Sequence, residues 1–384
     1  MISNSVKVPF VDLSLQHQPI HNELEQAIAL TIERGDYILG QAVAEFEVAF
    51  AKACGVQYGV GVSSGTSAIA LGLQACGIGK GDEVIVPTNT FIATVIGVIQ
   101  AGAIPILVDC DENTALIDLE AAAAAVTPST KGIIPVHLYG QLVSPSQLLD
   151  FAQTHDLIIV EDCAQAHLAQ REGMIAGSIG RVAGFSFYPS KNLGAMGNGG
   201  IVVTNDESIA KKLRSLRNYG ASRKYIHIEL GTNSRLDTLQ AAILQIKLPY
   251  LADWNLQRNR AAKLYDELLT PLSDRGILPL QNYSGMGHIY HLYILRLGQF
   301  FGEARELIGQ KLATRGIQTG IHYPIPCHLQ PAYQYLGYQQ GDFSHAEALS
   351  QQILSLPMYP GITDNQIELV CQELISIVDH LKTD

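Results

Sequence analysis

An isolated amine stands in an apolar, glycine-rich stretch of this chain. Lys191 lies in "FSFYPSKNLGAMGNGG" (residues 185–200) and is the only charged residue between Arg181 and Asp206. Such a lysine can lay its stem on apolar neighbours and keep its head in water. Alternatively, its surroundings depress its pKa, so that the neutral amine can attack a carbonyl. Because active-site lysines are rare among lysines, this stretch alone favours the structural interpretation.

A possible anion site is formed by "SSGTSA" (residues 63–68), at an expected strand-to-helix turn. Gly65 allows the backbone to approach a ligand closely, and the exposed N–H groups and dipole of a helix N-terminus favour an anion such as phosphate. A serine or threonine that caps an ordinary helix explains the same residues. Both interpretations stay open from this stretch alone.

A pair of acids ends an apolar run in "LIIVEDCAQAH" (residues 157–167), where Glu161 and Asp162 follow four aliphatic residues. In an open α/β sheet, ligands bind outside the carboxyl ends of the strands. A carboxylate at that position could pair with a pyridine nitrogen, keep it protonated and make the ring an electron sink. The alternative is a solvated strand end or a helix cap.

A phosphate anchor, an electron sink and a covalent tether are together what pyridoxal phosphate requires of a protein. The three stretches supply these parts in one chain, which reverses the balance in favour of a cofactor site around Lys191. Phe91, at the start of "FIATV", could stack on the cofactor ring, although a lone aromatic is more often a core residue.

The elements that must position these residues alternate from about residue 56 to 204. Apolar, β-branched runs precede amphipathic or alanine-rich stretches, which predicts a mostly parallel sheet covered by helices, an α/β fold. The expected strands are "YGVGVSS" (58–64), "DEVIVP" (82–87), "IPILVD" (104–109), "GIIPVHL" (132–138) and "LIIVED" (157–162). "VAGFSFYP" (182–189) and "GGIVVTN" (199–205) predict two adjacent strands with the Lys191 loop between them.

The chain after residue 250 has the pattern of a smaller α/β domain. A long helical pattern over residues 234–269 is interrupted near Pro249. We expect a strand at "HLYILRL" (291–297), a helix at 302–316, a strand near "TGIHYP" (319–324) and a terminal helix after residue 365. This predicts a large cofactor-binding domain over residues 1–250 and a small domain over 251–384.

The composition indicates a globular protein and argues against several other classes. With 47% hydrophobic and 16% charged residues among 384, the chain can bury a sizeable core. Its net charge of −11 and the absence of any basic block argue against a nucleic-acid partner. The six cysteines form no C-x-x-C pair, so neither a metal site nor a disulfide framework is expected. No signal peptide or membrane span is evident, and we expect a soluble cytoplasmic protein.

The motifs together resemble a known family. The chain is similar to the pyridoxal phosphate-dependent aminotransferases of nucleotide-linked keto-sugars, the DegT/DnrJ/EryC/StrS type, within the type I aspartate aminotransferase-like fold. The resemblance is carried by "VPFVDL", "YILGQAVAEFEVAFA", "VSSGTSAIAL", "GDEVIVPTNTFIAT", "PVHLYGQ", "VEDCAQAH", "FSFYPSKNLGAMGNGG", "GTNSRLDTLQAAIL", "HYPIPCHLQPAY" and "LSLPMYPG". These motifs extend over nearly the whole chain.

The resemblance implies a role for each matching position in binding pyridoxal 5'-phosphate. Lys191 would hold the cofactor covalently and shuttle the proton, and Asp162 would pair with the pyridine nitrogen. Gln165 would contact the ring hydroxyl and Phe91 would stack on the ring. The phosphate would be held by Gly65, Thr66 and Ser186, and by Asn233 of a neighbouring subunit. The last role implies a homodimer with shared active sites.

The resemblance also implies the reactants. An amino acid, expected to be L-glutamate, would donate the amino group to a nucleotide-linked keto-sugar. The nearest branch makes dTDP-3-amino-3,6-dideoxyhexoses from dTDP-3-keto-6-deoxyhexoses, while 4-keto-sugars and UDP-linked 3-keto-sugars stay open. The candidate sugar contacts are Tyr188, His322, Tyr323 and His328, and the candidate nucleotide contacts are Lys224, Tyr225, His227 and Arg235.

Two departures from the family pattern bear on specificity. Asn198 stands where an acid is common, and Leu168 stands where a glycine is common. Three rival interpretations are a dehydratase, a non-catalytic regulator or binding module on the same fold, and an aminotransferase for a cyclitol or another non-nucleotide ketone. The dehydratase branch has histidine in place of Lys191, and a regulator should have lost Lys191, Asp162 or the phosphate turn. None of these is missing here.

Overall fold

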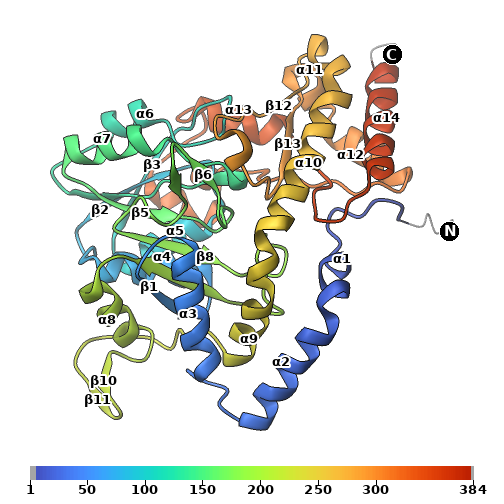
Figure 1. Ribbon diagram of the computed structural model, residues 1–384. Coiled ribbons are helices and arrows are strands. Elements are labelled where there is room, and N and C mark those ends of the chain that lie inside the picture. Colours follow the sequence, from blue (N-terminus) through green and yellow to red (C-terminus); the bar gives the residue numbers. More distant parts are fainter. Residues whose placement is uncertain (1–5, 382–384) are drawn as a thin grey trace.

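The computed structural model describes residues 6–381 and is organised around a seven-stranded sheet (Figure 1). The first five residues lie outside the described part, as do the last three. The sheet consists of β1 (Tyr58–Val62), β2 (Glu83–Pro87), β3 (Ile104–Val108), β4 (Thr130–Ile133), β5 (Ile158–Asp162), β8 (Val182–Ser186) and β9 (Gly200–Thr204). Every strand expected between residues 58 and 205 is therefore present.

The strand order is β1-β9-β8-β5-β4-β2-β3. The β5–β8, β4–β5, β2–β4 and β2–β3 pairs are parallel, whereas β9 runs antiparallel to both β1 and β8. The prediction of a mostly parallel sheet is confirmed, and so is the adjacency of the two strands that flank Lys191. All strands except β9 thus direct their carboxyl ends to one edge, where ligands bind in open α/β sheets.

Helices cover both faces of the sheet, and the alternation of β8 shows which helix covers which face. Phe185 packs edge-on against Phe50 of α3 (Gln41–Ala53) with ring centroids 5.0 Å apart. Gly184 faces the other side, where an added Cβ would lie 3.0 Å from Ile69 of α4 (Gly65–Ala75). Period-2 alternation therefore gives β8 an aromatic face and a face of small residues.

The crossover helices follow their strands as the sequence pattern predicts. They are α5 (Ala93–Ala101), α6 (Leu119–Ala124) and α7 (Pro145–His155). After β9 the chain continues into α8 (Glu207–Leu216), which leads to no further strand of the large sheet. The short elements of this part are η2 (Leu138–Gly140), the pair β6 (Gln170–Arg171) and β7 (Met174–Ile175), and the hairpin β10 (Ala221–Arg223) and β11 (Ile226–His227).

An N-terminal helical segment lies beside the end of this part of the chain (Figure 1). It consists of α1 (Ser14–His17), η1 (Gln18–Ile20) and α2 (His21–Arg34), and α2 packs on α9 (Thr238–Lys247). The helical pattern continues from α9 through η3 (Leu248–Tyr250) into α10 (Leu251–Leu269), so the interruption expected near Pro249 is a 3-10 turn.

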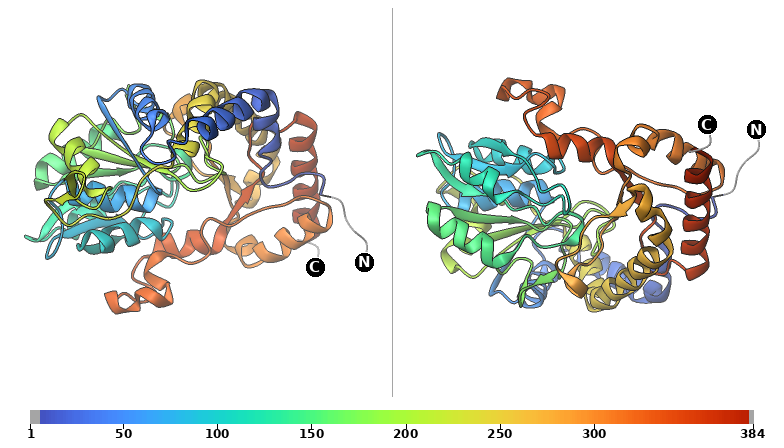
Figure 2. Two further views of the ribbon diagram at one scale, coloured as in Figure 1. Left: turned by 90° about the horizontal axis from the view of Figure 1, so that it is seen from below. Right: turned by 90° about the horizontal axis from the view of Figure 1, so that it is seen from above.

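The C-terminal part holds a three-stranded antiparallel sheet with helices packed on it. The strands are β12 (Leu278–Pro279), β13 (Tyr293–Arg296) and β14 (Ile353–Leu356), and the helices are α11 (Gly298–Glu303), α12 (Arg305–Thr314), α13 (Ser344–Gln352) and α14 (Asp364–Leu381). The short elements are η4 (Thr270–Arg275), η5 (Gly285–Gly287), η6 (Cys327–Leu329) and η7 (Pro331–Leu336). Figure 2 shows that the segment with η6 and η7 projects outward from the body of the molecule.

One expected strand has a different form. The segment near "TGIHYP" makes only an isolated antiparallel bridge, Gly320 to Ser355, on the edge of β14 that faces away from β13. Two large hydrophobic clusters correspond to the two sheets, but Ile289, Leu349 and Ile353 from the C-terminal part join the first cluster. The division into domains at residue 250 stays a prediction.

Candidate active site

A cavity of about 470 Å³ lies at the carboxyl edge of the large sheet and contains the Lys191 side chain. Ten of the sixteen predicted site residues line it, from strands, turns and loops that are far apart in the sequence. They are Gly65, Thr66, Phe91, Asp162, Gln165, Ser186, Tyr188, Lys191, His322 and Tyr323. The fold therefore brings the three chemically suggestive stretches together.

The phosphate-type turn lies between β1 and α4. Ser64 caps the helix, because its side chain accepts a hydrogen bond from the Ser67 backbone N–H. This leaves the N–H groups of Gly65 and Thr66 in the first turn free to meet an anion. Ser186 of β8 is immediately adjacent: a Cβ on Gly65 would lie 2.7 Å from the Ser186 Cβ. The helix-cap and anion-site interpretations are thus compatible in one turn.

The two neighbouring acids of β5 point to opposite faces of the sheet. Asp162 lines the cavity, where its Oδ2 accepts a hydrogen bond from the Thr94 hydroxyl at 2.8 Å and its Oδ1 accepts one from the Ala164 N–H at 3.0 Å. Glu161 is fully buried on the other face, 3.0 Å from His137 Nε2. Only one of the pair is available for chemistry.

Glu161 has a structural environment that accounts for its charge. Its two oxygens accept hydrogen bonds from the backbone N–H groups of Gly177, Ile179 and Gly180 at 2.8 to 3.0 Å. His137 Nδ1 in turn accepts the N–H of Val143 at 3.1 Å, so its Nε2 carries the proton that Glu161 accepts. The buried carboxylate thus ties the loop before β8 to β5 and fixes the strand that ends in Asp162.

The Lys191 loop is folded tightly against itself. The Lys191 backbone N–H donates to the Tyr188 carbonyl at 2.9 Å, and the Ala195 N–H donates to the Phe187 carbonyl at 2.8 Å. Burial lowers the pKa of the Lys191 amine to about 8, and the charge of Asp162 opposes that shift. A larger share of neutral amine is therefore present near neutral pH than for an ordinary lysine.

The side chains of Gln165, Tyr323 and Phe91 form one wall of the cavity. Gln165 accepts the Tyr139 N–H at 2.7 Å and donates to the Tyr323 hydroxyl at 3.1 Å. The Tyr323 ring lies 5.4 Å from the Phe91 ring. Phe91 keeps 53% of its surface exposed, which is unusual for a phenylalanine in a core and suits a ring that covers a ligand.

Two histidines add neutral polar groups to the cavity. His322 stacks on Phe10 with ring centroids 5.6 Å apart, and its Nδ1 lies 2.8 Å from the Ser355 hydroxyl. Burial and the charge of Lys191 lower the pKa of His322 to about 4. The same causes hold the pKa of His291 well below its usual range. Both rings are neutral near pH 7.

Several residues that line the cavity were not identified from the sequence. Thr94 orients Asp162, and His291 reaches the cavity from the turn before β13. Thr90 and Ser190 line it as well. Thr94 lies three residues after Phe91, so only the α5 helix period could have indicated it. No local pattern marks His291, because its approach depends on the packing of the C-terminal part.

Six predicted residues lie outside this cavity. Lys224, Tyr225 and His227 lie on the exposed hairpin of β10 and β11, where Tyr225 is 83% exposed and the Lys224 amine lies 5.2 Å from its ring. Asn233 is also exposed, in a bridge with Asn218. Arg235 donates to Asn218 Oδ1 at 2.9 Å and lies over the Tyr219 ring.

His328 is the sixth and is a buried residue. Its Nδ1 lies 2.9 Å from the Thr88 hydroxyl and its Nε2 lies 3.1 Å from Glu347 Oε1. Both ring nitrogens are therefore engaged within the protein. The chain folds His328 into the junction between β2 and α13, outside the cavity.

The two departures from the family pattern differ in position. Leu168 has a φ of 65° and does not line the cavity. This left-handed backbone strains a leucine and suits glycine, which gives a physical reason for the glycine common at that position. Asn198 does line the cavity, so it is the departure that can contact a substrate.

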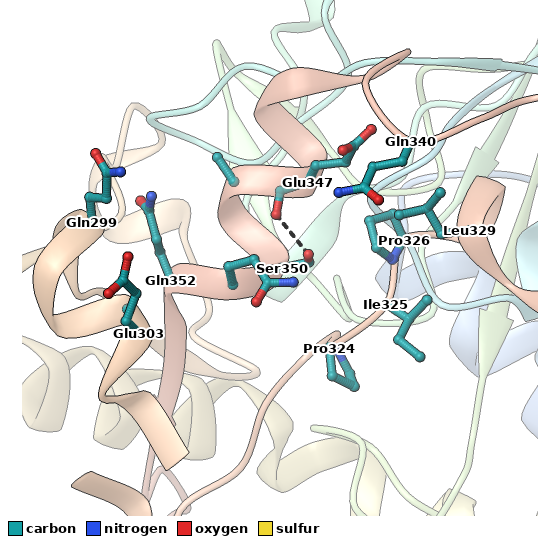
Figure 3. A pocket seen from close by; sticks show the side chains of 13 residues that line it. Gln299, Glu303, Pro324, Ile325, Pro326, Leu329, Gln340, Glu347, Ser350 and Gln352 are labelled. Atoms are coloured by element: carbon teal, nitrogen blue, oxygen red, sulfur yellow. Dashed lines mark hydrogen bonds between the residues drawn. The ribbon is translucent and has the colours of Figure 1, made fainter. Parts of the chain in front are cut away.

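A second hollow of about 560 Å³ lies between α11, α13 and residues 324–329 (Figure 3). Its lining is mainly amide, carboxylate and proline side chains. These include Gln299, Glu303, Pro324, Gln340, Glu347 and Gln352. None of the described residues that line it is a lysine, arginine or histidine, so it has no cationic group for a phosphate. The Lys191 cavity is therefore the candidate active site.

The Lys191 cavity fits pyridoxal phosphate on its own geometry. Gly65 leaves open the space beside Ser186 that a Cβ would fill, and α4 is long enough to present its N-terminus to a phosphate. Asp162 keeps acceptor capacity, because each oxygen accepts one hydrogen bond in the structure. The amine, the carboxylate and the phosphate turn thus meet in one cavity.

Comparison with known proteins is consistent with this chemistry. A model of the DegT/DnrJ/EryC1/StrS aminotransferase family matches residues 18–375. The chain belongs to this family. The predicted family, the α/β fold class and the aminotransferase activity are thereby confirmed.

Individual relatives cover nearly the whole chain. The dTDP-3-amino-3,4,6-trideoxy-alpha-D-glucose transaminase of Streptomyces venezuelae is 43% identical over 93% of this chain and 92% of its own. A Geobacillus stearothermophilus protein named pleiotropic regulatory protein is 39% identical over 98% of this chain and 100% of its own. The crystal structure of S. venezuelae DesV with a ketimine intermediate matches with a TM-score of 0.92 and 42% identity, over 96% of this chain and 98% of that chain.

Between residues 6 and 381, no helix is both long enough and apolar enough to cross a membrane.

Proposed function

We propose that this aminotransferase moves the amino group of L-glutamate to a nucleotide-linked keto-sugar in the cytoplasm, with a dTDP-3-keto-6-deoxyhexose as the acceptor. The observation that carries the proposal is the convergence of Lys191, Asp162 and the phosphate turn in one cavity. Among the described residues, one lysine and one carboxylate line that cavity, which is the charge pattern of a site for pyridoxal phosphate.

Each predicted cofactor residue has a proposed role. Lys191 would hold pyridoxal phosphate covalently, Asp162 would pair with the pyridine nitrogen, Gln165 would meet the ring hydroxyl and Phe91 would cover the ring. Gly65, Thr66 and Ser186 would bind the phosphate. When bound, the cofactor supplies an electron sink that stabilises negative charge at the carbon bearing the amino group.

The protein's own contribution to the reaction is proton transfer. The Nζ atom of Lys191, once free, takes the proton from the α-carbon of the amino donor and later returns one to the sugar carbon that receives the amino group. A pKa of about 8 suits both directions, because the amine can accept and release a proton near neutral pH. Thr94 holds Asp162 in place, since its hydroxyl donates to Oδ2.

The nucleotide is proposed to bind across the interface of a homodimer. The hairpin carries Lys224, Tyr225 and His227 in exposed positions, and the nearby Ile228 and Leu230 are 68% and 98% exposed. Exposed apolar side chains of this size in one loop favour a surface that is covered in the working protein. Asn233 and Arg235 would reach the active site of the neighbouring subunit from the same region.

A regulator on the same fold is the second candidate function, because one relative is named a pleiotropic regulatory protein. A regulator has no need for a lysine of lowered pKa beside an oriented carboxylate. The retention of Lys191, Asp162 and the free helix N-terminus in one cavity therefore favours the enzyme.

The test is the visible absorption spectrum of the purified protein before and after glutamate. We expect a yellow protein that loses its colour with glutamate and regains it when the keto-sugar is added. Lys191→Ala should lack the yellow covalent form, whereas Lys211→Ala, an exposed lysine paired with Glu207, should match the wild type. A wild-type protein that stays colourless with added pyridoxal phosphate would support the regulator instead.

The acceptor is tested by competition among nucleotide sugars. Recovery of the yellow colour should be fastest with the dTDP-3-keto-6-deoxyhexose and slower with UDP-linked 3-keto-sugars or dTDP-4-keto-sugars. Free dTDP should inhibit competitively. If free dTDP and UDP have no effect while a simple cyclic ketone is turned over, the acceptor carries no nucleotide.

A further inference from the structure

A second buried lysine lies behind the Lys191 loop. Lys247, the last residue of α9, is 1% exposed. Its amine donates to the carbonyl of Gly194 and lies 3.2 Å from Nε2 of His17 on α1. The ring of Trp254 is 5.9 Å away. Each of these partners is neutral, so the ammonium is held by dipoles and a π face in place of a carboxylate.

The position of this lysine is costly, which indicates that its contacts have a purpose. Burial lowers the pKa of Lys247 to about 8, and no neighbouring carboxylate opposes that shift. The same burial, together with the charge of Lys247, lowers the pKa of His17 to about 4, so the imidazole is neutral and accepts at Nε2. An apolar side chain of similar length would avoid the cost of burying an ammonium.

The carbonyl that Lys247 binds belongs to the loop that presents Lys191. Gly194 follows Lys191 by three residues and packs on the start of the same loop, because a Cβ on Gly194 would lie 2.1 Å from the Pro189 carbonyl oxygen. The backbone from Pro189 to Gly194 is thus one compact unit. A constraint on the Gly194 carbonyl is therefore passed directly to the backbone of Lys191.

α9 also holds the loop at a second point, through a side chain on the same face of the helix. Gln240 lies seven residues before Lys247, two turns along α9, so both side chains point to the loop. Gln240 Oε1 accepts the Met196 N–H at 2.8 Å, and its Nε2 lies 3.4 Å from the Met196 carbonyl. On the opposite side, Asn192 donates to Asn255 of α10 at 2.8 Å.

We propose that Lys247 is a positioning residue for the aminotransferase reaction: its ammonium holds the Gly194 carbonyl and thereby fixes the loop that presents Lys191 to the cavity. His17 completes the arrangement, since it orients the ammonium from α1. The inference rests on the function proposed for Lys191, and it adds a contribution from α9 and the N-terminal segment that no cavity residue supplies.

The first experiment compares Lys247→Met with the wild type by amide hydrogen exchange of the cofactor-free protein. Methionine keeps the length and removes the donors. We expect exchange in residues 187–197 to rise about tenfold or more, while exchange in β4 and β5 is unchanged. The matched control is Lys211→Met, an exposed lysine of α8, which should leave the loop unaffected. Unchanged exchange in the loop overturns the inference, whatever happens to activity.

The second measurement separates kcat from KM in the holoenzyme. Misplacement of Lys191 should lower kcat for Lys247→Met by about 10- to 100-fold. The KM for the keto-sugar should stay close to that of the wild type, because Lys247 does not line the cavity. Lys247→Arg, which keeps a cationic donor, should recover part of kcat. A raised KM with unchanged kcat overturns the inference.

Variants of His17, the partner of the Lys247 amine, test the inference even if Lys247→Met does not fold. His17 is only partly buried, so His17→Leu should fold. His17→Leu removes the acceptor and should raise hydrogen exchange in residues 187–197 by a smaller factor than Lys247→Met does. His17→Gln keeps an acceptor and should resemble the wild type. If His17→Leu and His17→Gln behave alike, the inference fails. If the wild type itself binds no pyridoxal phosphate, the proposed function fails, and the exchange data still decide the position of the loop.

Discussion

The Lys191 cavity and the hairpin of β10 and β11 both hold predicted site residues, yet they are built in opposite ways. In the cavity the polar side chains already have partners: Asp162 accepts from Thr94, and Gln165 bonds Tyr139 and Tyr323. On the hairpin, Tyr225 is 83% exposed and the Lys224 amine lies 5.2 Å from the Tyr225 ring. The cavity is organised by one chain before any ligand arrives, whereas the hairpin leaves its side chains exposed, which fits the proposed contact with a second subunit.

This contrast is tested most strongly at Asp162. We expect Asp162→Asn to lower kcat/KM by about 10³-fold, because a preorganised charge at the reacting group is lost. Glu161→Gln is the matched control on the same strand. It should leave the folded enzyme active but lower the free energy of unfolding by about 3 kcal/mol, since it breaks a buried charged network. Steady-state kinetics and urea unfolding separate the two effects, and equal loss of activity in both variants would contradict the distinction.

The second prediction concerns the fraction of Lys191 that is neutral, which should exceed that of an ordinary lysine a few hundredfold. A pKa of about 8 in place of 10.5 gives Lys191 roughly 300 times more neutral amine near pH 7. Attachment of pyridoxal phosphate to the cofactor-free protein should therefore speed up with rising pH and level off above about pH 8. Borohydride reduction and peptide mapping should find the label on Lys191 and only background on Lys224. Attachment that accelerates up to pH 10 would show that the cavity does not depress the pKa.

The hairpin side is tested by mixing two inactive variants. If Asn233 completes the site of a neighbouring subunit, each site takes Lys191 from one subunit and Asn233 from the other. In a mixed dimer of Lys191→Ala and Asn233→Ala, one site then carries both substitutions and the other site carries neither. Random mixed dimers then contain one intact site in half of the molecules, so activity should return to about a quarter of the wild-type value. Activity that equals the sum of the two separate variants would place Asn233 in its own subunit's site.

The smallest effect should come from the hairpin tyrosine. Tyr225→Ala should raise the KM for the nucleotide sugar about tenfold, with kcat and the yellow colour retained. A ring that binds the nucleotide stabilises the bound substrate and the transition state equally, so its loss weakens binding without slowing the reaction step. Tyr335→Ala is the control, a tyrosine of η7 with 68% exposure outside the cavity. A fall in kcat for Tyr225→Ala would mean that the hairpin takes part in the reaction step.

The sequence could predict the large sheet because its strands are encoded locally. Each is a short β-branched run followed by an amphipathic stretch, and the pleat then directs Asp162 to one face and Glu161 to the other. The convergence of Gly65, Asp162 and Lys191 follows from the rule that parallel strands end at one edge. The order of the strands, with β9 between β1 and β8, has no local signal, since it depends on pairing between distant segments.

The residues that were missed depend on long-range packing. His291 enters the cavity because the C-terminal part packs on the large sheet, and Lys247 reaches Gly194 because α9 crosses behind the loop. His328 was expected at the sugar, but its two ring nitrogens bind Thr88 and Glu347. The local sequence does not distinguish a histidine that contacts substrate from a histidine that is buried in the protein. The strand expected near "TGIHYP" is reduced to a single bridge, because only Gly320 of this segment pairs with the outer edge of β14, at Ser355.

The placement of β9 has a consequence for how the protein reaches its native state. The phosphate turn follows β1, and a Cβ on Gly200, at the start of β9, would lie 2.4 Å from the Ser64 carbonyl oxygen. β8 and β9 are neighbours in sequence and can pair early, whereas β1 must wait to join β9 from far up the chain. Refolding should thus yield a chain with its lysine loop formed before its anion turn. The return of bound cofactor should lag behind the return of secondary structure and mark the last step.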